Sequence, residues 1–388
     1  MTLKLTDVPS APQQTHSVPK DWRPSATWDG NSGEITSEAL PGNPNFEQLL
    51  MDHGHDPSLV EVFGPVRTSR WQVPRKGGES EWLTSFRFNI QTKVTANSID
   101  LPALFAAAKK TKVKTPPKRT GEALVVVWAD PQTGKSDHRG GTPELIARVE
   151  EKLAKLEAYI KTQKTSTAVF LNAGDSIEGF ENVPSQNFTN DLSLMDQLDL
   201  EATLEWSFLK LLRDTHSDVT SATVGSNHCA WRKGKDSLGR PKDDWGLYIQ
   251  RQHQRLSDEI GLGIKFTEPE TWSDSLALDI NGTIVGLVHG HQARPGKFVD
   301  YWSRVQHGGG ALAHCDLVVS GHYHSLLIQP SGRNPYTGKP KWHLQAPTLD
   351  NGSSWWKNSA GGGSDSDPGL LVFTIGADGL NLQSLAVL

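Results

Sequence analysis

Five short polar motifs lie in order along this chain, and each directly follows an apolar run rich in β-branched residues. Such runs are typical of strands buried on both faces of a parallel sheet. A side chain just past such a strand can leave the sheet edge without disturbing the core, which is where open α/β sheets place their ligands. The runs cover residues 123–128, 168–171, 222–224, 284–288 and 317–319. The motifs are Asp130-Pro131-Gln132, Gly174-Asp175-Ser176-Ile177-Glu178, Gly225-Ser226-Asn227-His228, His289-Gly290-His291 and Gly321-His322-Tyr323-His324.

The motifs offer carboxylates, amides and imidazoles rather than thiolates, a donor set that suits Mn, Fe or Zn. The two oxygens of Asp175 can bridge two cations held roughly 3.5–4 Å apart. Asn227 can bind a cation without adding charge, and the adjacent His228 can protonate a leaving alkoxide. His289 and His291 alternate at the end of a strand, so we expect at most one of them to reach a metal.

Each motif alone has an ordinary structural explanation. An Asp-Pro-Gln turn or an Asn-His pair usually only closes a loop, and a single buried histidine is more often a hydrogen-bonded core residue than a ligand. Five histidines lie at the ends of three separate runs, one of which also carries Asn227, and the other two runs each end in an aspartate. This distribution argues against that explanation for the whole set.

This ordered set resembles the calcineurin-like metallophosphoesterase superfamily, whose pattern runs Asp-x-His, Gly-Asp-x-x-Asp/Glu, Gly-Asn-His, a lone His and Gly-His-x-His. The resemblance spans residues 130–324 and implies an α/β fold, a four-layer α-β-β-α sandwich. It also implies two divalent metal ions, Mn before Fe, Zn or Mg. One ion would be held by Asp130, Gln132, Asp175 and His324, and the other by Asp175, Asn227, His289 and His322. His228 would act as the acid, in a catalytic set with Asp175 and Asn227.

Two positions depart from the superfamily pattern. Gln132 replaces the usual histidine, and although an amide oxygen can still bind a cation, the change should weaken that metal or alter which metal is preferred. Ser226 separates Gly225 from Asn227, a minor shift in the loop. Arg232 and Lys233 follow closely and would neutralise the substrate phosphate; the alternative is a solvated loop.

The substrate class is the more open question. Residues 66–119 carry 12 basic and 3 acidic side chains, a net +9 within a chain of net charge −5. This block, with Lys109, Lys110, Lys112 and Lys114, is a candidate polyanion-binding surface or a solvated linker. Trp355-Trp356 could stack on a base or latch a loop. The sequence is also similar to bacteriophage-encoded phosphoesterases likened to Mre11/SbcD nucleases.

Three functions therefore compete. The first is a phosphodiesterase or nuclease acting on DNA or RNA, with roles such as phage replication or DNA repair. The second is a small-molecule phosphatase or cyclic-nucleotide phosphodiesterase, for which neutralising residues 109–114 should leave activity unchanged. The third, a non-catalytic scaffold, is disfavoured because only Gln132 departs from the ligand pattern.

We expect an N-terminal extension over residues 1–118 and a catalytic domain over 119–388. The extension should contain an extended lead (1–40), a helix from Asn45, a second helix from Asp56-Pro57, and strands over 68–73 and 82–91 joined by a basic turn (75–79). This order resembles a small winged-helix module; a lobe that packs on the main domain is the alternative. A linker should follow over 111–120.

In the catalytic domain, amphipathic patterns predict helices over 143–160, 194–212 and 245–260, and a terminal hairpin over 370–388. No apolar run reaches the ~18–20 residues that a membrane span requires, and the N-terminus lacks a secretory pattern. Only Cys229 and Cys315 occur, which argues against a disulfide framework. A cytoplasmic location, the host cytoplasm for a phage protein, fits best, and a homo-oligomer is left open.

Overall fold

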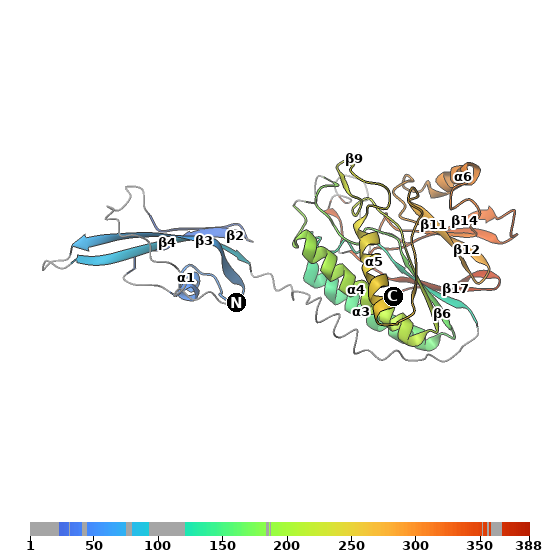
Figure 1. Ribbon diagram of the computed structural model, residues 1–388, viewed down its shortest axis with the longest axis horizontal. Coiled ribbons are helices and arrows are strands. Elements are labelled where there is room, and N and C mark those ends of the chain that lie inside the picture. Colours follow the sequence, from blue (N-terminus) through green and yellow to red (C-terminus); the bar gives the residue numbers. More distant parts are fainter. Residues whose placement is uncertain are drawn as a thin grey trace. The chain divides into compact units, whose positions relative to one another are not determined.

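The chain divides into two units, Met1–Asn97 and Ser98–Leu388, drawn in Figure 1. The computed structural model describes residues 23–30, 32–40, 45–74, 80–92, 121–183, 186, 188–350, 352–354, 357 and 367–388. The predicted boundary after residue 118, the linker over 111–120, the lysines at 109–114, the turn at 75–79 and Trp355-Trp356 lie outside these residues.

The first unit is an antiparallel sheet with one helix in its described part. The strand order is β1-β2-β4-β3, with bounds Ser25–Trp28 (β1), Ser32–Thr36 (β2), Val60–Pro74 (β3) and Ser80–Thr92 (β4). Helix α1 (Phe46–Asp52) starts where the Asn45 side chain accepts a hydrogen bond from the Glu47 backbone. Apolar residues alternate along β4, so one sheet face is buried. This core contains Ile35, Leu49, Leu50, Val60, Phe86, Phe88 and Ile90.

The hairpin and the helix from Asn45 are confirmed, with both strands longer than predicted. The second helix is wrong: the Asp56 carboxylate accepts hydrogen bonds from the backbone and hydroxyl of Ser58, which closes a turn, and β3 begins at Val60. The described part of residues 1–40 forms β1 and β2 instead of an extended lead, because Ile35 anchors β2 in the core. The described residues therefore form a sheet with one helix, not a winged-helix arrangement.

The second unit contains two sheets that pack face to face. In the first, β10 (Lys265–Thr267), β7 (Asp218–Thr223), β6 (Thr167–Asn172) and β5 (Ala123–Trp128) are parallel, and the antiparallel strands β16 (Leu371–Gly376) and β17 (Gly379–Val387) complete it. In the second, β12 (Thr283–Val288), β13 (Leu317–Ser320) and β15 (Pro340–Gln345) are parallel. Its antiparallel edges are β11 (Ser275–Ile280) and β14 (Leu327–Arg333). A short hairpin, β8 (Arg232–Lys233) with β9 (Asp236–Ser237), lies outside both sheets.

The main core lies between these sheets. Along β5, Ala123, Val125 and Val127 face the second sheet and join its Leu287 and Val319 in one buried cluster. The alternate residue Trp128 faces the helices, with its ring 5.0 Å from that of Phe208. Because β5 is buried on both faces, its sequence is continuously apolar rather than alternating.

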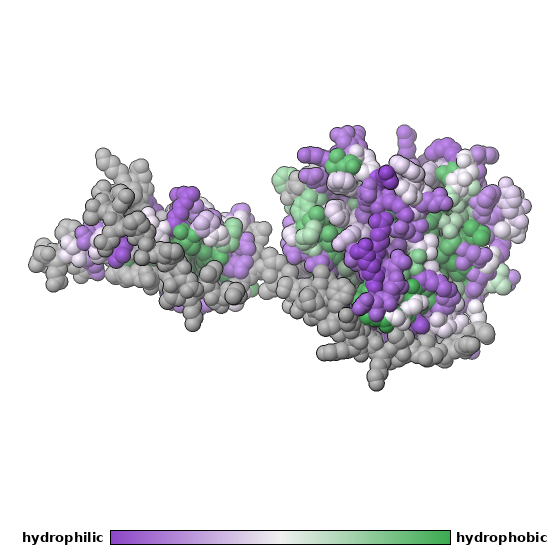
Figure 2. Space-filling view, viewed as in Figure 1, coloured by the Kyte–Doolittle hydropathy of each residue, from purple (hydrophilic) through white to green (hydrophobic). Residues whose placement is uncertain are grey.

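Helices cover the outer face of each sheet. Figure 1 shows α3 (Thr142–Thr162), α4 (Leu194–Thr215) and α5 (Trp245–Glu259) side by side over the first sheet. Helix α6 (Phe298–Gly308) buries Trp302 against Val288 and Val318 of the second sheet. Figure 2 shows hydrophilic side chains along the outward face of α5. The four layers are therefore α-β-β-α, which confirms the predicted fold class, its first three helices and the terminal hairpin.

Two further expectations can be compared with the described residues. Cys229 and Cys315 are both buried and unpaired. No helix in the described part of the chain is long and apolar enough to cross a lipid bilayer.

Candidate metal centre

The five motifs lie at the carboxyl ends of parallel strands from both sheets. Asp130 and Gln132 follow β5, and Asp175 follows β6. The Asn227-His228 motif follows β7, the His289 motif follows β12, and the motif with His322 and His324 follows β13. Because parallel strands of one sheet end at a common edge, the topology places these loops together.

An unusual backbone conformation marks the same residues. Six described residues other than glycine have a positive φ, and five of them belong to the motifs: Asp130, Gln132, Asp175, His322 and His324, with φ between 45° and 70°. This left-handed conformation costs residues with a Cβ atom about 1 kcal/mol or more, so a folded protein retains it mainly where the surroundings enforce it, often at functional sites.

Asp175, His289 and His322 form a compact cluster. Their ligating atoms all lie within 4.8 Å of one another, the one such group among the described residues. The Nε2 atom of His289 lies 3.1 Å from Oδ2 of Asp175 and 2.8 Å from Oδ1 of Asn227. These residues supply one carboxylate, one amide oxygen and two imidazoles at one point.

Hydrogen bonds around the cluster orient its members. The Nδ1 atom of His289 donates to the carbonyl of Ala173 at 2.8 Å, which leaves Nε2 facing Asp175 and Asn227. The hydroxyl of Ser226 accepts a hydrogen bond from the backbone N–H of Asp175 at 2.8 Å. Such supporting contacts fix the tautomer and direction of a metal ligand.

The cluster fits a divalent cation. With the proton of His289 on Nδ1, its Nε2 lone pair converges with the oxygens of Asp175 and Asn227, three acceptors that need a positive charge between them. Burial alone would lower the pKa of His289, but Asp175 outweighs it and raises this pKa to about 9, so a proton on Nε2 supplies this positive charge and a divalent cation would replace that proton. Burial and the nearby His289 lower the pKa of His322 to about 2, so its imidazole is neutral and able to bind a cation.

The remaining predicted ligands lie in the same region but are arranged differently. Both carboxylate oxygens of Asp130 accept hydrogen bonds from the backbone N–H of His322, at 3.0 and 2.9 Å. The Nε2 atom of His324 lies 3.5 Å from Oδ1 of Asp130. The amide oxygen of Gln132 accepts a hydrogen bond from Lys135. This second group is less compact than the cluster around Asp175.

His228, the predicted acid, lies beside both groups. Its backbone N–H donates to Oδ1 of Asp175 at 2.9 Å, and its ring Nδ1 lies 3.1 Å from the backbone carbonyl of Glu178. Its Nε2 atom faces Gln132 at 3.3 Å and Oδ2 of Asp175 at 4.0 Å. Burial lowers the pKa of His228, but the carboxylates of Asp175 and Glu178 outweigh it and raise this pKa to about 9.

The two predicted phosphate-binding residues differ in position. The guanidinium of Arg232 donates two hydrogen bonds, of 3.1 and 2.8 Å, to the backbone carbonyl of Asn227. Arg232 therefore supports the loop that carries Asn227 and His228. Lys233 is exposed on β8 and contacts no motif residue in the described part of the chain. His291 is exposed, with its ring 6.1 Å from that of His322, whereas His289 is buried.

The chain has a distant similarity to several solved structures. No family model and no curated protein matches it. The Zn-complexed Vps29 of Entamoeba histolytica is a similar solved structure, 14% identical with a TM-score of 0.30 over 68% of this chain and 97% of that chain. A Streptococcus pneumoniae protein described as a predicted phosphoesterase is 12% identical, with a TM-score of 0.24 over 69% of this chain and 98% of that chain. PhoD is 8% identical, with a TM-score of 0.30 over 92% of this chain and 83% of that chain. Similarities this distant transfer no activity to this chain.

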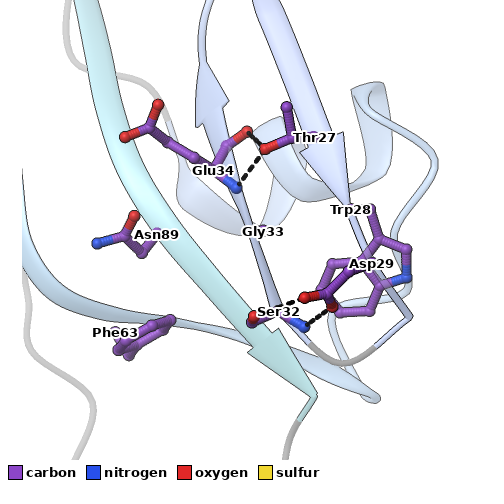
Figure 3. A pocket seen from close by; sticks show the side chains of 8 residues that line it. All are labelled: Thr27, Trp28, Asp29, Ser32, Gly33, Glu34, Phe63 and Asn89. Atoms are coloured by element: carbon purple, nitrogen blue, oxygen red, sulfur yellow. Dashed lines mark hydrogen bonds between the residues drawn. The ribbon is translucent and has the colours of Figure 1, made fainter.

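A separate hollow lies in the first unit (Figure 3). Its volume is about 530 Å³, and it is open to solvent. The lining includes the carboxylates of Asp29 and Glu34 but no lysine or arginine. Such a lining does not favour a phosphate group, so this hollow is not the substrate site that the motifs predict.

Proposed function

We propose that this protein is a divalent-metal-dependent phosphoesterase that hydrolyses phosphodiester bonds, with DNA or RNA as its substrate. The observation that carries the proposal is the convergence of Asp175, Asn227, His289 and His322 on one point, with His228 beside it. Carboxylate, amide and imidazole ligands suit Mn²⁺, Fe or Zn, and Mn²⁺ is the first candidate. Two such ions would be held, the second by Asp130 and its neighbours.

Each residue has a defined task in this proposal. Bound divalent cations would neutralise the phosphate and acidify a bound water. Asp175 and Asn227 balance this charge with one anionic and one neutral ligand. His228, with its pKa raised by Asp175 and Glu178, carries the proton that a departing alkoxide requires. Arg232 fixes the loop that presents Asn227 and His228.

A nucleic-acid substrate is supported by the basic side chains of the first unit. Arg67 and Arg87 face each other in the register of β3 and β4, and Glu34 offsets part of this positive charge by pairing with Arg87 at 2.6 Å. Arg70, on the same strand as Arg67, lies over the ring of Trp82 at 4.7 Å. Phosphate backbones bind such cationic groups in a salt-dependent way. A nucleic-acid substrate would agree with the predicted roles in phage replication or DNA repair.

The proposal is tested with Mn²⁺-loaded protein and a panel of phosphate esters. Bis-p-nitrophenyl phosphate, linear duplex DNA, single-stranded DNA and RNA should be cleaved, and p-nitrophenyl phosphate should be a poor substrate. An Asp175→Asn protein, prepared in parallel, controls for contaminating nucleases. Activity confined to the monoester would replace this proposal with a small-molecule phosphatase.

A further inference from the structure

Lys135 is a buried cation that the metal-site pattern does not include. It lies three residues after Gln132 in the same loop, with only 7% of its surface exposed. Its ammonium donates to Oε1 of Gln132 at 2.7 Å and to Oδ2 of Asp350 at 2.5 Å. Asp350 is itself buried, so the pair is largely shielded from solvent.

This contact fixes the orientation of the Gln132 amide. An ammonium group can only donate hydrogen bonds, so the amide atom that contacts Lys135 must be the oxygen. The amide nitrogen then faces the other way, 3.3 Å from Nε2 of His228. Gln132 thus presents N–H groups, which have no lone pair for a cation, toward the catalytic histidine.

The two halves of the centre are therefore unequal. The half around Asp175 has four donors that converge and a supporting contact on His289. The other half has Asp130, whose two oxygens are both engaged by His322, and His324 at 3.5 Å. Of its two other expected donors, Asp175 is shared with the first half, and the oxygen of Gln132 is occupied by the ammonium of Lys135.

We infer that Lys135 weakens the second metal half-site, so that this chain binds one divalent cation tightly and a second at least about tenfold more weakly. Lys135 withholds the Gln132 oxygen from a cation, and the buried carboxylate of Asp350 holds the ammonium in that position. Neither Lys135 nor Gln132 binds the cation in this inference; Lys135 acts by holding the amide oxygen of Gln132 away from it. The inference rests on the proposed function in assuming that the centre binds divalent cations.

The test is the stoichiometry and affinity of Mn²⁺ alone on the full, metal-free chain, by isothermal titration calorimetry and elemental analysis after dialysis. The wild type should retain one tight equivalent and bind a second at least about tenfold more weakly. In Lys135→Met/Asp350→Asn, which removes both charges of the buried pair together, the Gln132 oxygen is released, so the second equivalent should tighten about tenfold while the first is unchanged. Lys341→Met is the matched control and should change neither equivalent. Lys341 is also buried, and it lies over the ring of Trp302, at the end of the second sheet away from the five motifs.

A second variant keeps the inference testable if the double variant does not fold. Gln132→Ala in the wild-type background should leave both affinities within about twofold, because the oxygen it removes is not a ligand. A tenfold loss of the second equivalent would overturn the inference, as would two equal equivalents in the wild type or an unchanged second equivalent in a folded double variant. A protein that bound no Mn²⁺ would contradict the proposed function as well.

Discussion

The carboxylate of Asp130 receives the backbone N–H of His322 on both of its oxygens, at 3.0 and 2.9 Å, across 192 positions of sequence. This contact joins the loop after β5 in one sheet to the loop after β13 in the other. Both residues have a positive φ. The centre is therefore held from both sheets, and its geometry depends on how they pack.

Asp175→Asn should abolish tight metal binding. The substitution keeps the size of the side chain but removes the one carboxylate of the compact cluster, so Mn²⁺ affinity should fall at least about 100-fold, at the upper end of losses seen for supporting residues. Isothermal titration calorimetry measures this directly. Asp279→Asn, in the β11–β12 turn where the carboxylate accepts from Gly282, should bind Mn²⁺ like the wild type; equal losses in both proteins would argue against the assigned cluster.

His228→Ala should separate metal binding from hydrolysis. Removal of a general acid typically costs about 10²–10⁴-fold in rate, while the ligands around Asp175 remain in place. The measurement is turnover of bis-p-nitrophenyl phosphate together with Mn²⁺ stoichiometry. His314→Ala, at an exposed histidine that contacts Tyr336, is the control. Unchanged turnover in His228→Ala would remove His228 from the catalytic set.

Gly321→Ala should disturb the centre through the Asp130 contact. A Cβ atom at Gly321 would lie 2.4 Å from Oδ2 of Asp130, so the carboxylate or the loop must move. We expect a loss of about 1–3 kcal/mol in the free energy of unfolding and weaker Mn²⁺ binding. Urea denaturation of the metal-free protein measures the first effect. At Gly308, a Cβ atom would meet nothing within 4 Å, so Gly308→Ala should be neutral or slightly stabilising; similar losses in both variants would contradict the steric explanation.

Glu205→Gln should flatten the pH dependence of stability. Burial raises the pKa of Glu205 to about 8, whereas an unfolded glutamate titrates near about 4.3. Between these values the folded state holds a proton that the unfolded chain has released, so the free energy of unfolding of the wild type falls as pH rises through this window. A glutamine cannot ionise, so the decline should be smaller. Thermal denaturation at about pH 5, 7 and 9 measures this decline, since each kcal/mol of stability shifts the melting temperature by roughly 2–4 °C. The control is Glu157→Gln, at an exposed glutamate paired with Lys161, which should follow the wild type.

Arg67→Gln/Arg70→Gln should weaken nucleic-acid binding and leave the chemistry intact. Each lost phosphate contact should reduce the slope of log affinity against log salt by about 1. Fluorescence anisotropy with single-stranded DNA at several salt concentrations tests this, with hydrolysis of bis-p-nitrophenyl phosphate as the unaffected activity. Lys265→Gln, at a surface lysine paired with Asp218, is the control. An unchanged affinity for DNA would favour a small-molecule substrate.

The second unit was predictable because its signals are local. The apolar periodicity of α3, α4 and α5 specifies helices within a few residues of those observed, and the continuous apolar run of β5 indicates a strand buried on both faces. Helix α6 was not predicted, since only Phe298 and Trp302 of its residues are fully buried. In the first unit, Asp56-Pro57 resembles a helix start, but the Asp56 side chain closes a turn instead.

The sequence predicts which strand ends form the site, but it does not predict how the side chains are arranged there. The motifs indicate which side chains meet, because the parallel topology places their loops together. They do not indicate Lys135 and Asp350, which are 215 positions apart and belong to no motif. A lysine three residues after a candidate ligand has no periodic signal, and only the folded chain shows that it takes the Gln132 oxygen.

The order of the donors along the chain has a consequence for biosynthesis. His289 and His322 are added long after Asp175, and Asp130 obtains its partner only when residue 322 has been made. A nascent chain that has released only strands β5, β6 and β7 of the first sheet from the ribosome therefore lacks both imidazoles of the cluster. The early strands can therefore pair and fold before the complete set of metal ligands is present.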